Sequence, residues 1–358
     1  MERPAHLVLE DGSVFPGRAV GAPGTAAGEA CFTTAMAGYE QAVTDPSYAR
    51  QVLAFTFPLI GNYGVDEALL ESSRVWTEGV LMRRSRPAWS AWLATRGIVA
   101  LEEVETRSLV RRLRNGGAMR CALGEAPPEE LHALALAEPH LDWERALAEP
   151  QLASTAPALD ACVSEPFTVG AGPRVVVLDL GCKRSIVRRL AESGVEAVVV
   201  PGTWEADAIL ELEPAAVLVG NGPGDPAQLV EQVETVRALL GAAPVFGICL
   251  GHQLVALALG LRTYKLPFGH RGVNHPVQVR GTSRVLVTAQ NHGYAVEGSD
   301  AAEVSHVSLN DGTVEGLEGD GFATLQFHPE AAAGPHDALP FFDRIASACR
   351  SAPTFAQF

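Results

Sequence analysis

The sequence lacks the features that usually accompany nucleic-acid, membrane or structural-metal binding. Lys and Arg total 27 against 42 Asp and Glu, a formal net charge of −15, so little positive charge is available for phosphate backbones or anionic lipids. Six cysteines are scattered along 358 residues without CxxC pairs or His/Cys ligand spacing. We therefore expect no nucleic-acid partner, no membrane partner, no metal site and no disulfide framework.

Targeting signals are also missing from the residues given. The opening "MERPAHLVLEDG" has no charged segment followed by an apolar one, and no stretch reaches the ~18 uninterrupted apolar residues of a membrane span. Scattered thiols fit a reducing compartment, so we expect a cytoplasmic protein. A length of 358 residues exceeds one typical domain, which favours two.

Residues 1–150 have the pattern of a mixed α/β domain. We expect a hairpin around Asp11 and Gly12, because apolar runs flank that turn pair. The run "RQVLAFTFPLIGN" predicts a buried strand, and "AWSAWLATRG" and "TRSLVRRLRNGG" predict helices, the second ending on a glycine pair. Residues 151–173 carry scattered proline and small residues without a sustained period, which indicates a linker.

Residues 174–358 begin with β-branched runs that alternate with amphipathic helices. The predicted strands are "RVVVLDLG", "EAVVVPG", "AAVLVGNGPGD" and "APVFGICLG", separated by segments such as "KRSIVRRLAESG" and "PAQLVEQVETVRALLG". This alternation predicts an open, mostly parallel sheet flanked by helices, as in flavodoxin-like folds. Shorter alternating strands follow residue 261, and a last helix is expected near 337–348.

Cys249 lies between Gly247 and Gly251, where a predicted strand passes into a predicted helix. Small flanking residues permit the sharp turn of a nucleophile elbow, and the helix amides and dipole favour a thiolate. Ligands gather at the carboxyl ends of parallel strands, which is where this residue is expected. A thiol packed as a small hydrophobe is an equally good interpretation of this motif alone.

His328 and Glu330, in "ATLQFHPE", are the best candidates for a base and its orienting carboxylate. Residues two apart in an extended segment point the same way, so the carboxylate can orient the imidazole that activates the thiol. His328 could instead be a capping histidine beside a proline. His252, three residues after Cys249, competes for the base role, although its position at the start of the helix favours an orientation away from the thiol.

The glycine-rich segment "VGNGPGDP", residues 219–226, is a third candidate element at a strand end. Gly222 and Gly224 would let backbone amides approach a ligand, as in an oxyanion hole or a carboxylate-binding nest. It lacks the Lys-Ser/Thr ending of a phosphate loop. A plain turn before the helix explains the segment equally well on local grounds.

Together, "GNGPGDP", "GICLGHQ" and "FHPE" in this order resemble the triad-type class I glutamine amidotransferase family. The segments "LVLEDGSVFPGRAVG", "GYEQAVTDPSYARQ", "TFPLIGNYGV", "FGHRGVNHPV" and "QNHGYAV" resemble the small-subunit family of carbamoyl phosphate synthetase. This resemblance implies hydrolysis of L-glutamine through a cysteine thioester and transfer of ammonia to a large subunit. It implies no cofactor in this chain, with ATP and Mg on the large subunit.

The resemblance also implies roles for individual residues. Cys249 would be the nucleophile, His328 the acid and base, and Glu330 its orienting carboxylate. The backbone amides of Gly222 and Leu250 would hold the oxyanion. The remaining contacts to glutamine would come from Ser47, Gly224, Gln253, Asn291, Gly293 and Tyr294. Gln253 lies one helical turn after Cys249, within plausible reach of the same pocket.

Some positions depart from the family pattern. Arg271 and Val273 stand where the family usually has His and Gly, so a subunit contact around 268–276 could differ.

Two other functions are compatible with parts of the sequence: a catalytically silent assembly or regulatory subunit, and a stand-alone γ-glutamyl cysteine hydrolase. Retention of all three triad residues disfavours the first, and the additional N-terminal domain disfavours the second.

Overall fold

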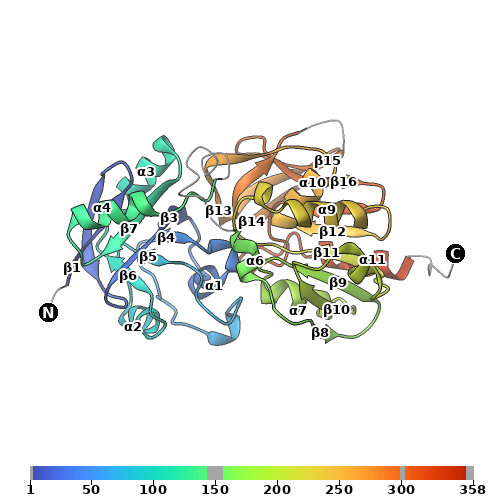
Figure 1. The fold of residues 1–358 in the computed structure, drawn as a ribbon, viewed down its shortest axis with the longest axis horizontal. Helices are drawn as coiled ribbons and strands as arrows, with labels where there is room; N and C mark the ends of the chain where they lie inside the picture. The colour runs from blue at the N-terminus through green and yellow to red at the C-terminus, as the bar shows by residue number, and fades with distance from the viewer. Residues whose placement is uncertain (1–2, 143–155, 299–302, 352–358) are drawn as a thin grey trace. The chain divides into compact units, whose positions relative to one another are not determined.

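The computed structural model describes residues 3–142, 156–298 and 303–351, and the chain divides into two compact units. Unit 1 comprises Met1–Pro157 with Lys265–Val273, and unit 2 comprises Ala158–Tyr264 with Asn274–Phe358 (Figure 1). A short stretch within the predicted second domain therefore groups with unit 1. The six cysteines carry free thiols. Within the described residues, no helix is both long and apolar enough to cross a bilayer.

Unit 1 is built on a closed barrel whose strand order is β1-β2-β6-β5-β4-β3-β7. Closure leaves no free sheet edge, and buried side chains such as Leu7, Val52 and Leu101 fill the interior. The strands are β1 (Pro4–Leu9), β2 (Val14–Ala19), β3 (Thr25–Thr33), β4 (Gln51–Phe55), β5 (Gly79–Leu81), β6 (Val99–Glu102) and β7 (Met119–Gly124). The α-helices among the described residues of unit 1 are α1 (Tyr39–Thr44), α2 (Pro87–Thr95), α3 (Thr106–Gly116) and α4 (Pro128–Ala137).

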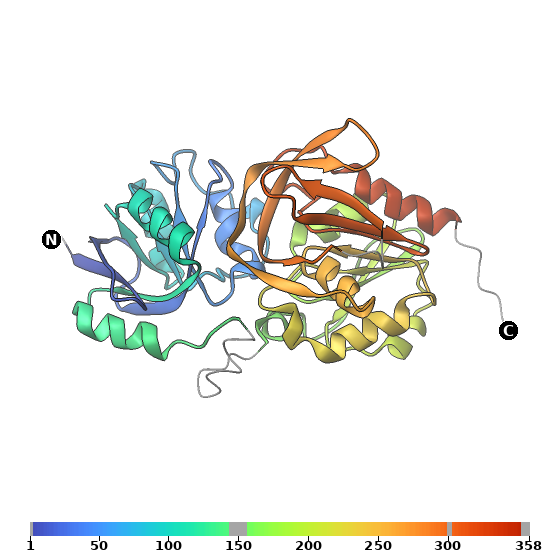
Figure 2. The same cartoon turned by 90° about the horizontal axis from the view of Figure 1, so that it is seen from above.

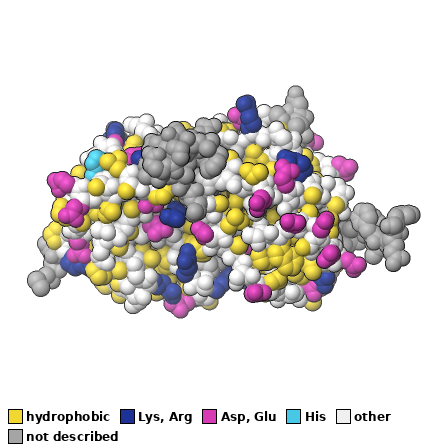
Figure 3. Space-filling model, viewed as in Figure 1, with side chains coloured by type: hydrophobic (Ala, Val, Ile, Leu, Met, Phe, Trp, Pro, Cys, Tyr) yellow, Lys and Arg dark blue, Asp and Glu magenta, His cyan; other side chains and the backbone are white. Residues whose placement is uncertain are grey.

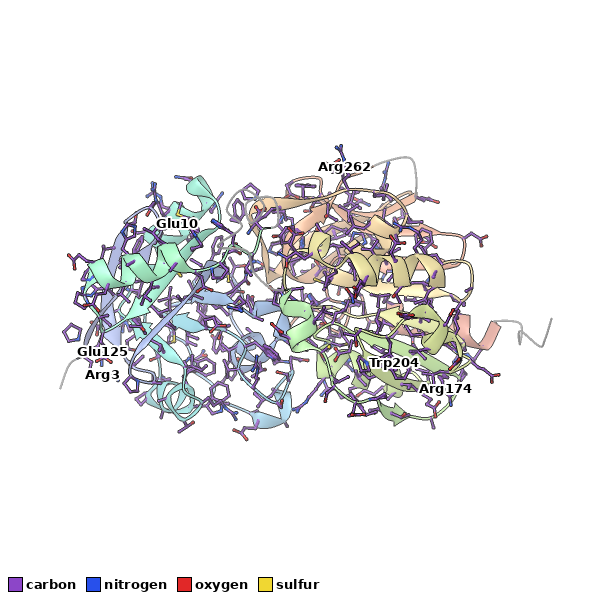
Figure 4. The ribbon with its side chains drawn as sticks, in the orientation of Figure 1. Arg3, Glu10, Glu125, Arg174, Trp204 and Arg262 are labelled. Carbon is purple, nitrogen blue, oxygen red and sulfur yellow. The ribbon has the colours of Figure 1, made fainter. Side chains whose placement is uncertain are left out.

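The hairpin predicted around Asp11 and Gly12 is confirmed. Strands β1 and β2 pair antiparallel, and the Asp11 side chain accepts a hydrogen bond from the Ser13 amide at 2.8 Å. Arg3, just before β1, pairs with Glu125, just after β7, with Nε 2.9 Å from Oε2 (Figure 4). This ion pair links two neighbouring strands of the barrel, and its exposure limits its contribution to about 0–1 kcal/mol.

The segment Lys265–Val273 contributes to unit 1 through both apolar and polar contacts. The ring of Phe268 stacks on that of Phe32 with centroids 6.0 Å apart, and Lys265 pairs with Glu29. Arg271 is buried and donates a hydrogen bond to the Phe268 carbonyl at 2.8 Å. The altered subunit contact around 268–276 stays a prediction.

Unit 2 contains a ten-stranded sheet in the order β14-β13-β15-β16-β17-β12-β11-β9-β10-β8. The strands are β8 (Phe167–Gly170), β9 (Arg174–Asp179), β10 (Glu196–Pro201), β11 (Ala216–Val219), β12 (Val245–Ile248), β13 (Thr263–Val279), β14 (Val285–Val296), β15 (Glu303–Ser308), β16 (Val314–Gly319) and β17 (Phe322–Leu325). Strands β10, β9, β11, β12 and β17 pair in parallel, as the alternating pattern predicts. Antiparallel strands extend the sheet on both sides.

Helices cover both faces of this sheet. Figure 2 shows α9 and α10 on one face and α11 on the other. The described helices of unit 2 are α6 (Pro157–Ala161), α7 (Arg184–Glu192), α8 (Ala206–Leu210), α9 (Val230–Leu239), α10 (Leu250–Ala258) and α11 (Pro340–Ser351). Both the predicted order of helices and strands from 174 to 258 and the last helix are confirmed.

The segment 151–173, predicted as a linker, carries regular structure in its described part. Helix α6 is followed by β8, which pairs antiparallel with β10 so that Phe167 lies opposite Val199. The alternation of Phe167 and Val169 with polar or small neighbours suits a short edge strand, although the prolines nearby obscure it. Residues 151–155 of the predicted linker lie outside the described residues.

Candidate active site

Cys249 occupies the sharp turn between β12 and α10. Its backbone has φ 55° and ψ −103°, a conformation that residues with a Cβ rarely adopt. The turn is held at both ends, because the Cys249 amide donates to Leu325 O at 2.8 Å and its carbonyl accepts from Gln253 N at 3.2 Å. The side chain is buried, with Sγ 3.6 Å from the Asn291 carbonyl oxygen. Such strain is typical of a functional position.

The two flanking glycines are required by close backbone contacts. A Cβ on Gly251 would lie 2.1 Å from Val219 O in strand β11, and one on Gly247 would lie 2.8 Å from the backbone of Gly251. Any side chain at either position would force the strands and helix apart. The nucleophile-elbow interpretation therefore agrees with the geometry of this turn.

His328 lies just beyond the end of β17, the strand next to β12. Its amide donates to Ala289 O at 2.9 Å, and its Nδ1 lies 2.7 Å from Glu330 Oε1. Because a carboxylate only accepts hydrogen bonds, Nδ1 carries the proton. His328 Nε2 is buried without a well-formed hydrogen bond among the described residues, which leaves it for chemistry at the thiol. The structure thus places imidazole and carboxylate in the predicted relationship.

Lys183 is a further member of this cluster that the sequence analysis did not identify. Its Nζ donates to Glu330 Oε1 at 2.7 Å and to Ala332 O at 3.0 Å, and the side chain is only 5% exposed. The Lys183 amide donates to Oδ1 of Asn221, a residue of the glycine-rich loop, at 3.1 Å. A lysine directly before a helix resembles an ordinary surface residue in sequence, so no local signal identified it.

The charges of this buried cluster stabilise one another. Burial alone would lower the pKa of His328, but the Glu330 carboxylate and the Cys249 sulfur raise it well above its usual 6.5, against an opposing effect of Lys183. Burial alone would raise the pKa of Glu330, whereas Lys183 and His328 together hold it far below its usual range. An imidazolium beside a carboxylate is therefore the favoured state of the pair.

His252, the competing candidate base, is bound elsewhere. Its Nδ1 lies 2.8 Å from Thr324 Oγ1, and the side chain is fully buried. Burial, with a smaller contribution from His306, lowers the pKa of His252 to about 3. A neutral ring committed to Thr324 acts as a structural link between α10 and β17.

The glycine-rich loop after β11 lies against the start of α10. A Cβ on Gly222 would approach Leu250 Cδ2 to 2.9 Å and Leu180 O to 2.0 Å, so only glycine fits there. Gly224 has φ 90°. Among the described residues, neither the Gly222 amide nor the Leu250 amide donates a hydrogen bond, which leaves both for an oxyanion.

The predicted glutamine contacts divide between the two units. Asn291, Gly293 and Tyr294 lie on β14, and the Asn291 carbonyl meets the Cys249 sulfur. Gln253 Nε2 is already engaged by Tyr294 O at 3.0 Å and by Gln326 Oε1 at 3.1 Å. Ser47 belongs to unit 1, in the short 3-10 helix Pro46–Tyr48, where its amide donates to Asp45 Oδ1 at 2.9 Å. The roles of these residues toward glutamine stay predictions.

Two protein families match complementary parts of the chain. Residues 7–123 match "Carbamoyl-phosphate synthase small chain, CPSase domain". Residues 176–348 match "Glutamine amidotransferase class-I", the part that contains Cys249, His328 and Glu330.

Relatives match over almost the entire chain. A carbamoyl phosphate synthase small chain of Symbiobacterium thermophilum is 45% identical, covering 94% of this chain and 96% of the relative. Those of Thermus thermophilus and Streptomyces coelicolor are 42% and 44% identical, covering 95% and 96% of this chain and 92% and 95% of the relatives.

Proposed function

Because the chain belongs to the carbamoyl phosphate synthase small chain family, we propose that it hydrolyses L-glutamine at Cys249 and supplies the ammonia to a large subunit. The observation that carries the chemical part is the chain of contacts from Lys183 through Glu330 to His328. It keeps a buried imidazole protonated at Nδ1 and leaves Nε2 for the reaction.

In the first half of the proposed reaction, the Cys249 thiolate attacks the carboxamide carbon of glutamine. The carbonyl oxygen becomes an oxyanion, for which the amides of Gly222 and Leu250 are the available donors. His328, as imidazolium, gives its Nε2 proton to the nitrogen, and the C–N bond breaks to release ammonia. A thioester between Cys249 and the glutamyl group remains.

In the second half, His328 is neutral at Nε2 and acts as the base. It removes a proton from a water molecule, whose oxygen attacks the thioester carbon through the same oxyanion site. The C–S bond breaks, glutamate leaves, and thiolate and imidazolium are regenerated. Glu330 stays ionised throughout, because Lys183 and His328 both stabilise its negative charge.

The partner and location follow from the same proposal. Ammonia passes to the large subunit as neutral NH3, and ATP and Mg²⁺ are bound there during carbamoyl phosphate synthesis. The six free thiols of this chain are stable in the cytoplasm, which supports that location.

The test compares nitrogen donors in the complex of this chain with its large subunit. Carbamoyl phosphate formation is measured with glutamine and with ammonium, for the wild type and for Cys249→Ala. We expect the variant to lose glutamine-dependent synthesis and to keep ammonium-dependent synthesis. Cys349→Ala is the matched control and should keep both. Loss of both activities in Cys249→Ala, or retention of both, would contradict the proposal.

A second measurement separates the two alternative functions. Glutaminase activity of the chain alone is compared with that after addition of the large subunit. A silent subunit gives no activity in either case. A stand-alone hydrolase gives the same activity in both cases, whereas the proposed function predicts an increase on assembly.

A further inference from the structure

Unit 2 contains a cavity of about 490 Å³ between the edge strand β8 and helix α7. Its walls are mainly apolar and include Phe167, Val169, Val187 and Val199. Volumes of this size are typical of sites for small organic ligands. The proposed glutaminase chemistry uses none of these side chains.

The strand that forms one wall is unusually exposed for its composition. Phe167 is 43% exposed and Val169 is 37% exposed, and β10 is the only strand paired with β8 in the described part of the sheet. Figure 3 shows apolar side chains gathered over the region where Figure 1 labels α7 and β8. Exposed apolar side chains that gather beside a cavity are typical of a ligand-binding groove.

The charged groups around the cavity leave one cation uncompensated. Glu192 is engaged by Arg189 at 2.8 Å and by Arg188 at 3.8 Å. The Asp179 carboxylate accepts hydrogen bonds from the amides of Val163, Gly181 and Cys182. Arg184 is exposed and forms no ion pair among the described residues. A guanidinium beside an apolar wall is complementary to a carboxylate, sulfonate or phosphate on an apolar body.

We propose that this cavity binds a small amphipathic anion, with its apolar body between β8 and α7 and its anionic group on Arg184. The cavity wall also includes Cys182, the residue before Lys183, whose Nζ holds Glu330. A bound ligand therefore contacts the turn that positions the catalytic carboxylate. This link to catalysis rests on the proposed function, whereas binding itself does not.

Binding is tested with 8-anilinonaphthalene-1-sulfonate, an aromatic sulfonate whose fluorescence rises in apolar sites. The full chain should bind one probe per molecule. Val169→Trp, which fills the cavity from an exposed edge strand, should weaken binding at least about tenfold. Thr168→Trp introduces the same ring on the opposite face of the same strand and should bind as the wild type does. Equal binding by wild type and Val169→Trp would overturn the proposal.

The anionic requirement is tested by removing the cation. Arg184→Gln should weaken sulfonate binding about fivefold and leave binding of the uncharged N-phenyl-1-naphthylamine unchanged. Arg237→Gln, an exposed arginine on α9, is the control and should change neither. If Arg184→Gln weakens binding of both probes equally, or of neither, then Arg184 does not bind the anionic group of the ligand.

The link to catalysis has its own measurement. Glutamine hydrolysis is followed at a probe concentration that saturates the fluorescence signal, with Val169→Trp as the control. We expect kcat to change at least about twofold in the wild type and to stay constant in the variant. Saturated binding with unchanged kcat would overturn the link to catalysis and leave the binding site intact. Absence of glutaminase activity without the probe would instead count against the proposed function.

Discussion

Lys183 and His328 donate to the same atom, Glu330 Oε1, each at a distance of 2.7 Å. One buried carboxylate oxygen therefore connects a lysine that precedes α7 with the histidine that follows β17. Lys183 and Glu330 have opposite effects on the imidazole, because the lysine lowers the pKa of His328 while the carboxylate raises it. The lysine consequently acts as a positioning residue that limits how strongly the imidazole holds its proton.

Replacement of Lys183 by methionine tests this relationship. We expect the pKa of His328 to rise further, so the alkaline limb of the pH profile of kcat/KM for glutamine should move to higher pH. Looser orientation of Glu330 should lower kcat/KM about tenfold. The measurement is the pH profile of glutaminase activity.

The control for Lys183→Met is Lys265→Met, which breaks another Lys–Glu pair, with Glu29. Both variants should lose about 1–3 kcal/mol in the free energy of unfolding, because each removes the lysine that pairs with a buried carboxylate. Only the first should shift the alkaline limb. A shift in both, or in neither, would contradict a specific role for Lys183.

The two histidines near Cys249 should differ sharply when replaced. His328→Asn should reduce kcat by about 100- to 10,000-fold, the usual contribution of a general acid and base. His252→Asn should stay within about tenfold of the wild-type kcat and lose about 1 kcal/mol of stability, because its bond to Thr324 is structural. Steady-state glutaminase assays and urea unfolding give both quantities. Comparable losses of kcat would show that the base has been assigned incorrectly.

Stability should depend on pH through His328. Its pKa is about 10 in the folded protein against 6.5 in the unfolded chain. A raised pKa contributes stability that is fully present below the unfolded value and is lost as pH rises through the folded one. The difference in free energy of unfolding between wild type and His328→Asn should therefore shrink from pH 6.5 to about 10. Urea titrations across that range measure it, and a constant difference would exclude the charged pair.

Gly251, two residues after Cys249, should not tolerate a methyl group. Gly251→Ala places Cβ 2.1 Å from Val219 O, so strand β11 or helix α10 must move. We expect a loss of about 1–3 kcal/mol in stability and a large loss of glutaminase activity, since the amide of Leu250 moves with the turn. Gly298→Ala, whose nearest neighbour would lie 3.7 Å away, should change neither. Thermal unfolding and glutaminase assays measure these two losses. A fully active Gly251→Ala variant would contradict the prediction that the turn has no room for a side chain.

Much of the fold follows from local patterns. The strands that become β9 to β12 are β-branched-rich runs bounded by glycine or proline, and the turn at Asp11 and Gly12 carries its own signal. The pairing of His328 with Glu330 also followed from sequence, because two residues at an interval of two in an extended segment share a face.

Other features depend on contacts between distant residues and have no local signal. Lys183 meets Glu330 across 147 positions of sequence. The segment Lys265–Val273 groups with unit 1 through partners near residue 30, such as Phe32 and Glu29. The closed barrel of unit 1 likewise requires β1 to pair with β7, more than a hundred residues later.

The backbone of Cys249 is held at φ 55° by its neighbours, at a cost of about 1–3 kcal/mol for a residue with a Cβ. The most stable form of this turn is therefore not the active one. Glycine at position 249 would relieve the strain and remove the sulfur together, which gives a more stable and inert protein. Selection for stability alone would remove the thiol, so this part of the chain exchanges folding stability for reactivity.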